Sequence, residues 1–285
     1  MKLFELHEYV GYAGIILSII LFIICYIVPM TKIRKTKSFE TNLRGKSLIE
    51  VKRYNRAMRK DIANNIVDIY NNADVALWYS SERIRALQHG ITMNNDKTIS
   101  SQLSDIYKYD VKPAANKMIT EYALKVFAVT AISQNEKLDS LYVIVSQLNL
   151  IKRLVALYGY RPSDDKLLKI YKTVLVNALL SYGAQSLSTS LATGIGKKIA
   201  DSASSIAFLG GAIETVLGST FDGVANLTFA VKVGIETRRY LIKEYHLQDI
   251  LDNIEDEETL NEEETQLIEE SKKESSKIKK NKKGK

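Results

Sequence analysis

The stretch Gly-Ile-Gly-Lys-Lys at residues 194–198 comes nearest to a site for phosphate chemistry. A phosphate-binding loop needs a glycine five residues before its second glycine, and a Ser or Thr after the lysine to hold Mg²⁺. Leu191 stands where that first glycine is needed, Lys198 stands where the hydroxyl is needed, and no β-branched strand precedes the stretch. The third glycine of a dinucleotide-binding motif is also missing. We therefore interpret these residues as a helix break.

The residues that catalyse reactions or bind metals elsewhere are scattered in this chain. His7, His89 and His246 are far apart in sequence and none has a second ligand at metal-binding spacing. The lone cysteine, Cys25, lies in an apolar segment, which excludes an intramolecular disulfide and a zinc site with several thiolates. The serines have no histidine nearby in sequence, and the pair Asp164–Asp165 is typical of a helix cap. We expect no enzymatic activity, no cofactor and no metal.

The composition predicts helices to position whatever site exists. The 285 residues contain three prolines against fourteen glycines, and helix-forming residues recur throughout. We predict an all-α fold. The net charge of +7 suits either a nucleic acid or an anionic lipid surface, so the position of the charges must decide between them.

Val10 to Met30 is a run of 21 residues without a charge. As a helix it spans about 31 Å, which matches a hydrocarbon core of about 30 Å. A cleaved signal peptide is the alternative, but Glu5 and Glu8 precede the run and no small-residue cleavage site follows it. We predict an uncleaved transmembrane anchor.

Basic residues follow this anchor closely, whereas Lys2 is the one basic side chain before it. We call the following six the basic collar: Lys32, Arg34, Lys35, Lys37, Arg44 and Lys46. The asymmetry predicts that the chain lies in a plasma (inner) membrane with its N-terminus outside and its body in the cytoplasm. Each basic residue of such a cluster contributes about 1 kcal/mol to the free energy of binding at an anionic lipid surface. The simpler alternative is that the collar only sets topology and solvates a helix face.

Apolar residues spaced by three and four predict one long amphipathic helix over residues 41–88, with Asn71–Asn72 as the place for any bend. His89 and Gly90 are expected to end it. Residues 91–113 are polar and predict a linker with at most one short helix near Leu103, and Pro113 suits the first turn of the next helix.

Two helices follow and meet at a polar break over residues 134–137. The second has a wide apolar face and is expected to stop at Gly159, since Pro162 blocks its continuation.

These two helices carry a resemblance to a known family. The matching residues are Thr130-Ala131-Ile132-Ser133, Asp139, Leu150-Ile151, Ala156-Leu157-Tyr158-Gly159, Arg161-Pro162, Val174 to Leu179, Tyr182-Gly183-Ala184 and Leu227 to Gly234. Over about residues 123–245 the chain resembles the YcjF-like family of bacterial membrane proteins, whose shared domain has no assigned function and also occurs fused behind Era-like GTPase domains. The resemblance implies a family motif or partner-docking site at Asp139, Tyr158, Gly159, Arg161 and Pro162. Where the family usually has Ser-Pro, this chain has Ser133-Gln134.

Members of this family are commonly predicted to cross the membrane more than once. In this chain, Glu214 and Asp222 fall inside the apolar segment 206–231, and an acidic residue at a helix centre costs roughly 2.5 to 3.5 kcal/mol on insertion. Segment 173–195 has no charge but many hydroxyl and amide side chains. We predict a helical hairpin packed through small residues, with Glu214 at its rim. Insertion of residues 173–231 in the bilayer stays open as the alternative.

Residues 247–285 switch from acidic to basic, which is typical of a disordered charged tail. The tail has no aromatic residues for base stacking, so we expect no nucleic-acid binding. The predicted organisation is an anchor with its basic collar (1–37), the amphipathic helix (38–90), the linker (91–113), the YcjF-like helical domain (114–246) and the tail (247–285).

The predicted function is that of a membrane-anchored, non-enzymatic adaptor or scaffold whose helical domain docks a partner. The resemblance suggests a GTPase supplied in trans as that partner, and membrane lipid is the other. The alternative is a membrane-remodelling or permeability protein that inserts residues 173–231.

Overall fold

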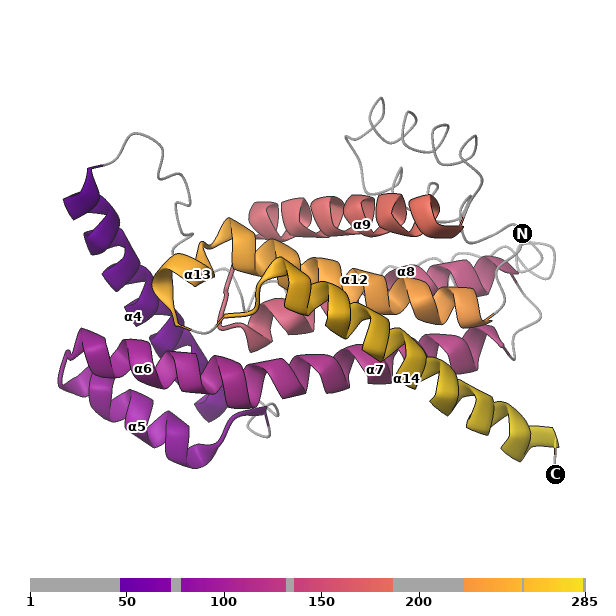
Figure 1. Cartoon of the computed structure of the whole chain (residues 1–285), viewed down its shortest axis with the longest axis horizontal. Helices are drawn as coiled ribbons and strands as arrows, with labels where there is room; N and C mark the ends of the chain where they lie inside the picture. Colours follow the sequence, from indigo (N-terminus) through magenta and orange to yellow (C-terminus); the bar gives the residue numbers. More distant parts are fainter. Residues whose placement is uncertain (1–46, 73–77, 132–135, 187–222, 253, 284–285) are drawn as a thin grey trace, which may run out of the picture. The chain divides into compact units, whose positions relative to one another are not determined.

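The computed structural model describes residues 47–72, 78–131, 136–186, 223–252 and 254–283 (Figure 1). Within these ranges it contains helices and no strand, which confirms the all-α prediction. The helices are α4 (Leu48–Asn72), α5 (Ser81–Thr92), α6 (Asp96–Ile106), the π-helix η3 (Tyr107–Val111), α7 (Lys112–Thr130), α8 (Glu136–Leu157), α9 (Asp164–Ser186), α12 (Gly223–Glu244), α13 (Leu247–Ile250) and α14 (Glu257–Lys283).

The chain divides into two compact units. Among the described residues, Arg161–Leu168 belong to one unit, and the remaining described residues belong to the other, larger unit. The predicted anchor Val10 to Met30 and the basic collar lie outside the described residues. Among the helices that the structure does describe, none combines the length and the apolar character needed to cross a membrane.

The single long helix predicted over residues 41–88 is instead two helices that pack against each other, α4 and α5. The apolar spacing is the same in both, so it does not reveal that α4 ends at Asn72. Gly90 does not end a helix either, because α5 continues to Thr92. A Cβ at Gly90 would lie 3.1 Å from Cγ2 of Thr98, so this glycine lets α5 and α6 approach closely.

The predicted linker over residues 91–113 is also helical, since α6, η3 and the start of α7 follow one another without a break. Asn95 caps α6 by accepting a hydrogen bond from the Thr98 N–H at 3.3 Å. Ile99, Leu103 and Ile106 are buried at helical spacing. Pro113 lies in the first turn of α7, as predicted.

Helix α12 occupies the centre of the larger unit and contacts α7, α8, α13 and α14. Gly234 lies where α12 meets α7, and a Cβ there would come within 2.5 Å of Cγ1 of Ile119. The two backbones therefore approach more closely than any side chain at residue 234 would allow.

Residues 257–283 form helix α14, which contradicts the prediction of a disordered tail. Leu260, Glu263, Leu267 and Ser271 are buried, at steps of three and four residues, so one face of α14 packs on α12 and α7.

The prediction of two separate helices is confirmed, since α7 ends at Thr130 and α8 begins at Glu136. Of the polar break predicted over residues 134–137, Glu136 and Lys137 belong to α8, and residues 134–135 lie outside the described part of the chain. Of the predicted small-residue hairpin, α9 and α12 are described. Residues 187–222 between them, including Glu214, lie outside the described part of the chain.

Candidate functional site

The turn after α8 holds the part of the family motif that the structure places in the larger unit. The Gly159 N–H donates to the Ala156 carbonyl at 2.9 Å and the Tyr160 N–H donates to the Val155 carbonyl at 3.1 Å, which closes the end of the helix. Gly159 has φ +75°, and a Cβ there would lie 2.8 Å from Cγ1 of Ile66 on α4. Both the backbone conformation and the space require glycine.

Two buried tyrosines hold this turn, Tyr79 just before α5 and Tyr107 in η3. The Tyr79 hydroxyl donates to the Leu157 carbonyl at 2.8 Å, and the Tyr107 hydroxyl donates to the Tyr158 carbonyl at 2.6 Å. The Tyr107 and Tyr158 rings meet edge to face with centroids 5.5 Å apart. Burial raises the pKa of Tyr79 and of Tyr107 well above the ordinary value, so both hydroxyls remain protonated donors.

Arg238 of α12 is the largest of the fully buried side chains in the described residues, with none of its side chain exposed. Its Nε donates to the Tyr158 hydroxyl at 3.2 Å. One terminal nitrogen donates to Asn116 Oδ1 and Glu263 Oε2, both at 2.6 Å, and the other donates to Glu255 Oε1 at 2.8 Å. Four of the five guanidinium N–H donors are thus satisfied inside the protein.

The electrostatics around Arg238 keep this cluster ionised. Burial by itself lowers the pKa of Arg238, but Tyr158, Glu255 and Glu263 outweigh it and raise that pKa. Burial also disfavours the charged form of Glu263 and so raises its pKa. Arg238 and Lys112 lower that pKa by more than burial raises it, so the pKa of Glu263 falls below the ordinary value. Lys112 forms an ion pair with the same carboxylate. The cluster therefore joins α7, α12 and α14 through full charges.

Two further ion pairs fix α14 to α12. Lys232, with 1% of its side chain exposed, donates to Glu264 Oε1 at 2.6 Å and to Ser181 of α9 at 3.2 Å. Arg239 pairs with Glu257 at 2.5 Å and with Glu236. Burial raises the pKa of Glu236.

The ion pairs of Arg238, Lys232 and Arg239 hold helices together and do not form a site that is open to a substrate. Arg238 and Lys232 bind their carboxylates within the protein, and removing either partner would leave a buried charge. Within the described residues, no group of three or more His, Cys, Asp or Glu side chains is placed to hold a metal ion.

The residues of the predicted motif fall in different environments. Tyr158 and Gly159 are buried, so neither presents a surface to a partner. Asp139 lies in α8, and Arg161 and Pro162 lie between α8 and α9. Pro162 is buried as well, whereas Arg161 is partly exposed. Asp139 and Arg161 therefore keep the role that the resemblance implies.

The sequence reasoning missed the buried cations of α12. Lys232 and Arg238 stand among apolar and small residues over a helix that is buried nearly all round. The sequence signal that could have revealed them is a lysine or an arginine within an otherwise apolar helix, because a buried cation needs an internal partner.

The comparisons with known proteins fit this region of the chain. A family profile described as a domain of unknown function, DUF697, matches residues 94–273, which is well over half of the sequence. The chain belongs to the DUF697 family. This confirms the resemblance to YcjF-like proteins and extends it from α6 to α14. The DUF697 match thus includes Tyr107, Tyr158, Arg238 and Glu263.

The DUF697 chain is also similar to a UPF0283 membrane protein of Bradyrhizobium diazoefficiens. The two are 32% identical over 69 residues, which is 24% of this chain and 20% of the relative. The match thus spans about a fifth of the relative's length. No solved structure matches the chain.

Proposed function

We propose that this DUF697 protein is a membrane-anchored, non-enzymatic adaptor that docks a protein partner on the outer face of α14. The observation that carries the proposal is the division of charge on α14. Its inner face is fixed to α12 and α7 by Glu263 and Glu264, whereas its outer face carries acidic side chains that are exposed. These exposed residues include Glu258, Glu262, Glu269 and Glu270.

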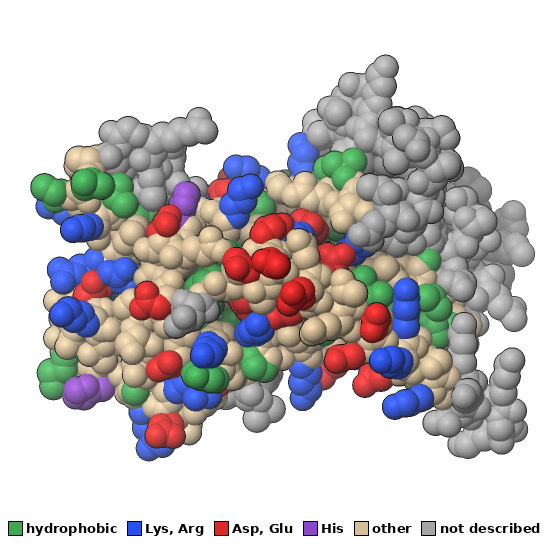
Figure 2. Space-filling model, viewed as in Figure 1, with side chains coloured by type: hydrophobic (Ala, Val, Ile, Leu, Met, Phe, Trp, Pro, Cys, Tyr) green, Lys and Arg blue, Asp and Glu red, His purple; other side chains and the backbone are tan. Residues whose placement is uncertain are grey.

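A helix held by buried ion pairs offers a partner a preformed surface, and less conformational freedom is then lost on binding. Figure 2 shows acidic side chains gathered over the part of the molecule where α12 and α14 lie. A partner with a basic surface would be attracted to this face and oriented by it.

Membrane attachment is the second part of the proposal. It is supported by the apolar run Val10 to Met30 with its basic collar, and by the relative from Bradyrhizobium, which is named a membrane protein. The proposed topology places the N-terminus outside a plasma membrane and the DUF697 domain in the cytoplasm.

The nature of the partner rests on the family resemblance alone. Because YcjF-like domains also occur fused behind Era-like GTPase domains, a separate GTPase supplied in trans is the partner that we propose for this chain.

The test is capture from native membranes with tagged full-length protein, in the presence of GTP or of GDP. We expect a nucleotide-binding protein to be recovered, with Glu262→Gln/Glu269→Gln reducing the yield severalfold. Glu82→Gln/Glu121→Gln removes two exposed charges elsewhere and should leave the yield unchanged. Recovery of no nucleotide-binding protein with either nucleotide would refute the GTPase partner, and equal yields from both variants would refute docking on α14. Leakage of dye from vesicles that contain the full chain would support the membrane-permeability alternative.

A further inference from the structure

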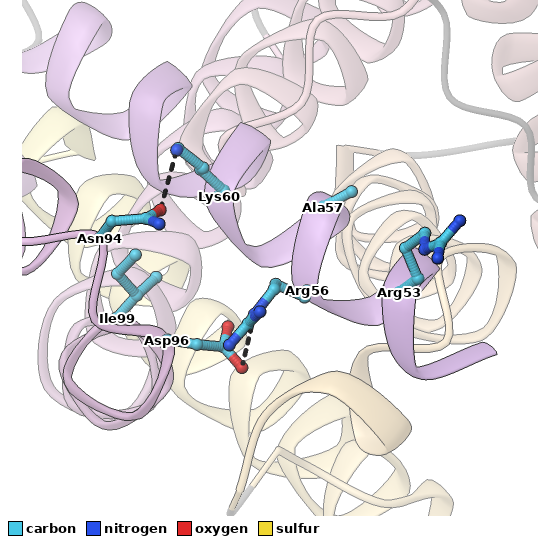
Figure 3. A pocket seen from close by; sticks show the side chains of 7 residues that line it. All are labelled: Arg53, Arg56, Ala57, Lys60, Asn94, Asp96 and Ile99. Carbon is cyan, nitrogen blue, oxygen red and sulfur yellow. Dashed lines mark hydrogen bonds and ion pairs between the residues drawn. The ribbon is translucent and has the colours of Figure 1, made fainter. Parts of the chain in front are cut away.

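A pocket of about 240 Å³ lies between α4 and the start of α6 (Figure 3). It is lined by Arg53, Arg56, Ala57, Lys60, Asn94, Asp96 and Ile99. The α4 residues come from one face of the helix, because positions 53, 56, 57 and 60 are three, four and seven apart. The ionic clusters of α12 and α14 contribute none of these residues.

The charge of this pocket is strongly positive despite Asp96. Arg59, which lies beside the lining, donates to both oxygens of that carboxylate at 3.0 and 2.5 Å. The hydrogen bond from Arg59 is the largest cause of the lowered pKa of Asp96, so the carboxylate stays ionised and paired. Arg56 forms a longer ion pair with the same carboxylate, since its Nε lies 3.7 Å from Asp96 Oδ2, and 69% of the Arg56 side chain is exposed.

The other two cations face neutral groups or solvent. Lys60 donates to Asn94 Oδ1 at 3.0 Å, as the dashed line in Figure 3 shows. Arg53 is exposed and has no ion-pair partner in the part of the chain that the structure describes. Arg53, Arg56 and Lys60 therefore form a rim of three positive charges along one face of α4.

The pocket also has an apolar component. Ile99 is buried at its base and Ala57 contributes a methyl group to its wall. On the same face of α4, one turn before Arg53, Ile49 is 74% exposed, and the adjacent Leu48 is 83% exposed. Exposed aliphatic side chains beside basic ones are typical of a helix that lies at a lipid surface.

We infer that this pocket binds the phosphate group of an anionic phospholipid, with the phosphate on Arg53, Arg56 and Lys60 and the glycerol region against Ala57 and Ile99. The inference rests on the proposed membrane attachment and makes it more specific. Residues 31–46 connect the predicted anchor to α4, and their extended length of about 55 Å lets the pocket reach the bilayer surface.

The experiment measures lipid binding to the full-length chain in detergent by native mass spectrometry. The probes are dioctanoyl phosphatidylglycerol, dioctanoyl phosphatidylcholine and inorganic phosphate. Ala57→Trp fills the pocket and leaves every charge in place. Arg53→Gln/Arg56→Gln/Lys60→Gln removes the rim, and Arg85→Gln/Lys272→Gln/Lys273→Gln removes the same charge from exposed positions elsewhere.

We expect phosphatidylglycerol to bind more tightly than phosphatidylcholine. Since each basic residue near a lipid surface adds to the attraction of an anionic head group, the rim variant should bind phosphatidylglycerol at least about tenfold more weakly. Ala57→Trp should weaken it similarly, and the control triple should not.

Two results would overturn the inference. Wild-type affinity in either variant would be one of them: in Ala57→Trp it would show that the pocket is not used, and in the rim variant that the three cations do not hold the phosphate. Inorganic phosphate binding as tightly as phosphatidylglycerol would exclude the lipid as the ligand. Either result leaves capture of a partner by α14 untouched, so a failure of the pocket and a failure of the adaptor proposal are distinguishable.

Discussion

Replacing Arg238 by methionine tests the ionic cluster most directly, because methionine keeps an unbranched side chain and removes the charge and all donors. Glu255 and Glu263 are each 9% exposed, so both carboxylates would remain largely desolvated. Removing one partner of a buried ion pair costs about 3–5 kcal/mol. Lys112 still pairs with Glu263 in the variant, which favours the lower end of that range. We therefore expect a loss of about 3 kcal/mol in the free energy of unfolding.

The assay is urea unfolding of the full chain in mild detergent, followed by far-ultraviolet circular dichroism. A loss of about 3 kcal/mol corresponds to a melting temperature lowered by about 6–12 °C. Arg85→Met, at an exposed position, should stay within about 0.5 kcal/mol of wild type. Adding Glu255→Gln to Arg238→Met should recover part of the loss, since no carboxylate then remains at position 255. A change below about 1 kcal/mol for Arg238→Met would refute the view that this cluster stabilises the fold.

Three other substitutions test separate contacts. Gly234→Val would place its Cβ within 2.5 Å of Ile119 Cγ1 and should lower the free energy of unfolding by about 1–3 kcal/mol in urea titrations; unchanged stability would contradict the close helix approach. Gly159→Ala, at φ +75°, should lose at least about 1–2 kcal/mol in thermal melts, and wild-type melting would argue against a left-handed residue there. The pKa of Glu263 is lowered, so its ionised form contributes stability that is full above its ordinary value of 4.5 and is lost as pH falls through the lowered pKa. Glu263→Gln should therefore be less stable at pH 7 and lose less stability between about pH 5 and 3, and an unchanged acid slope would contradict this linkage.

Several parts of the fold were predictable from local sequence. Pro113 in a first turn, the separation of α7 from α8 and the stop at Gly159 each depend on the backbone preferences of one or a few residues. Such preferences act within one turn of helix, so the sequence carries them without knowledge of the tertiary structure.

The parts that were missed depend on partners distant in sequence. The apolar spacing of α4 continues in α5, so periodicity alone cannot separate one long helix from two packed ones. In α14, two of the buried positions are Glu263 and Ser271, which weakened the apolar pattern and favoured the prediction of disorder. Arg238 finds its carboxylates 17 and 25 residues later, and only the packing of α14 on α12 brings them together.

The π-helix η3 takes up one extra residue in a helical rod that runs without a break from α6 into α7. A π turn contains one residue more than an α turn, and each residue of an α-helix advances the chain by about 100° around its axis. Deleting one residue within Tyr107–Val111 would therefore replace the π turn by an α turn and leave α7 in nearly the same rotational phase relative to α6. Ile119 would still face Gly234, and Lys112 would still face Glu263. Deleting one residue between Lys112 and Ile119 would instead turn these two side chains about 100° apart. Loss of one residue should therefore be tolerated within η3 and not within the first two turns of α7.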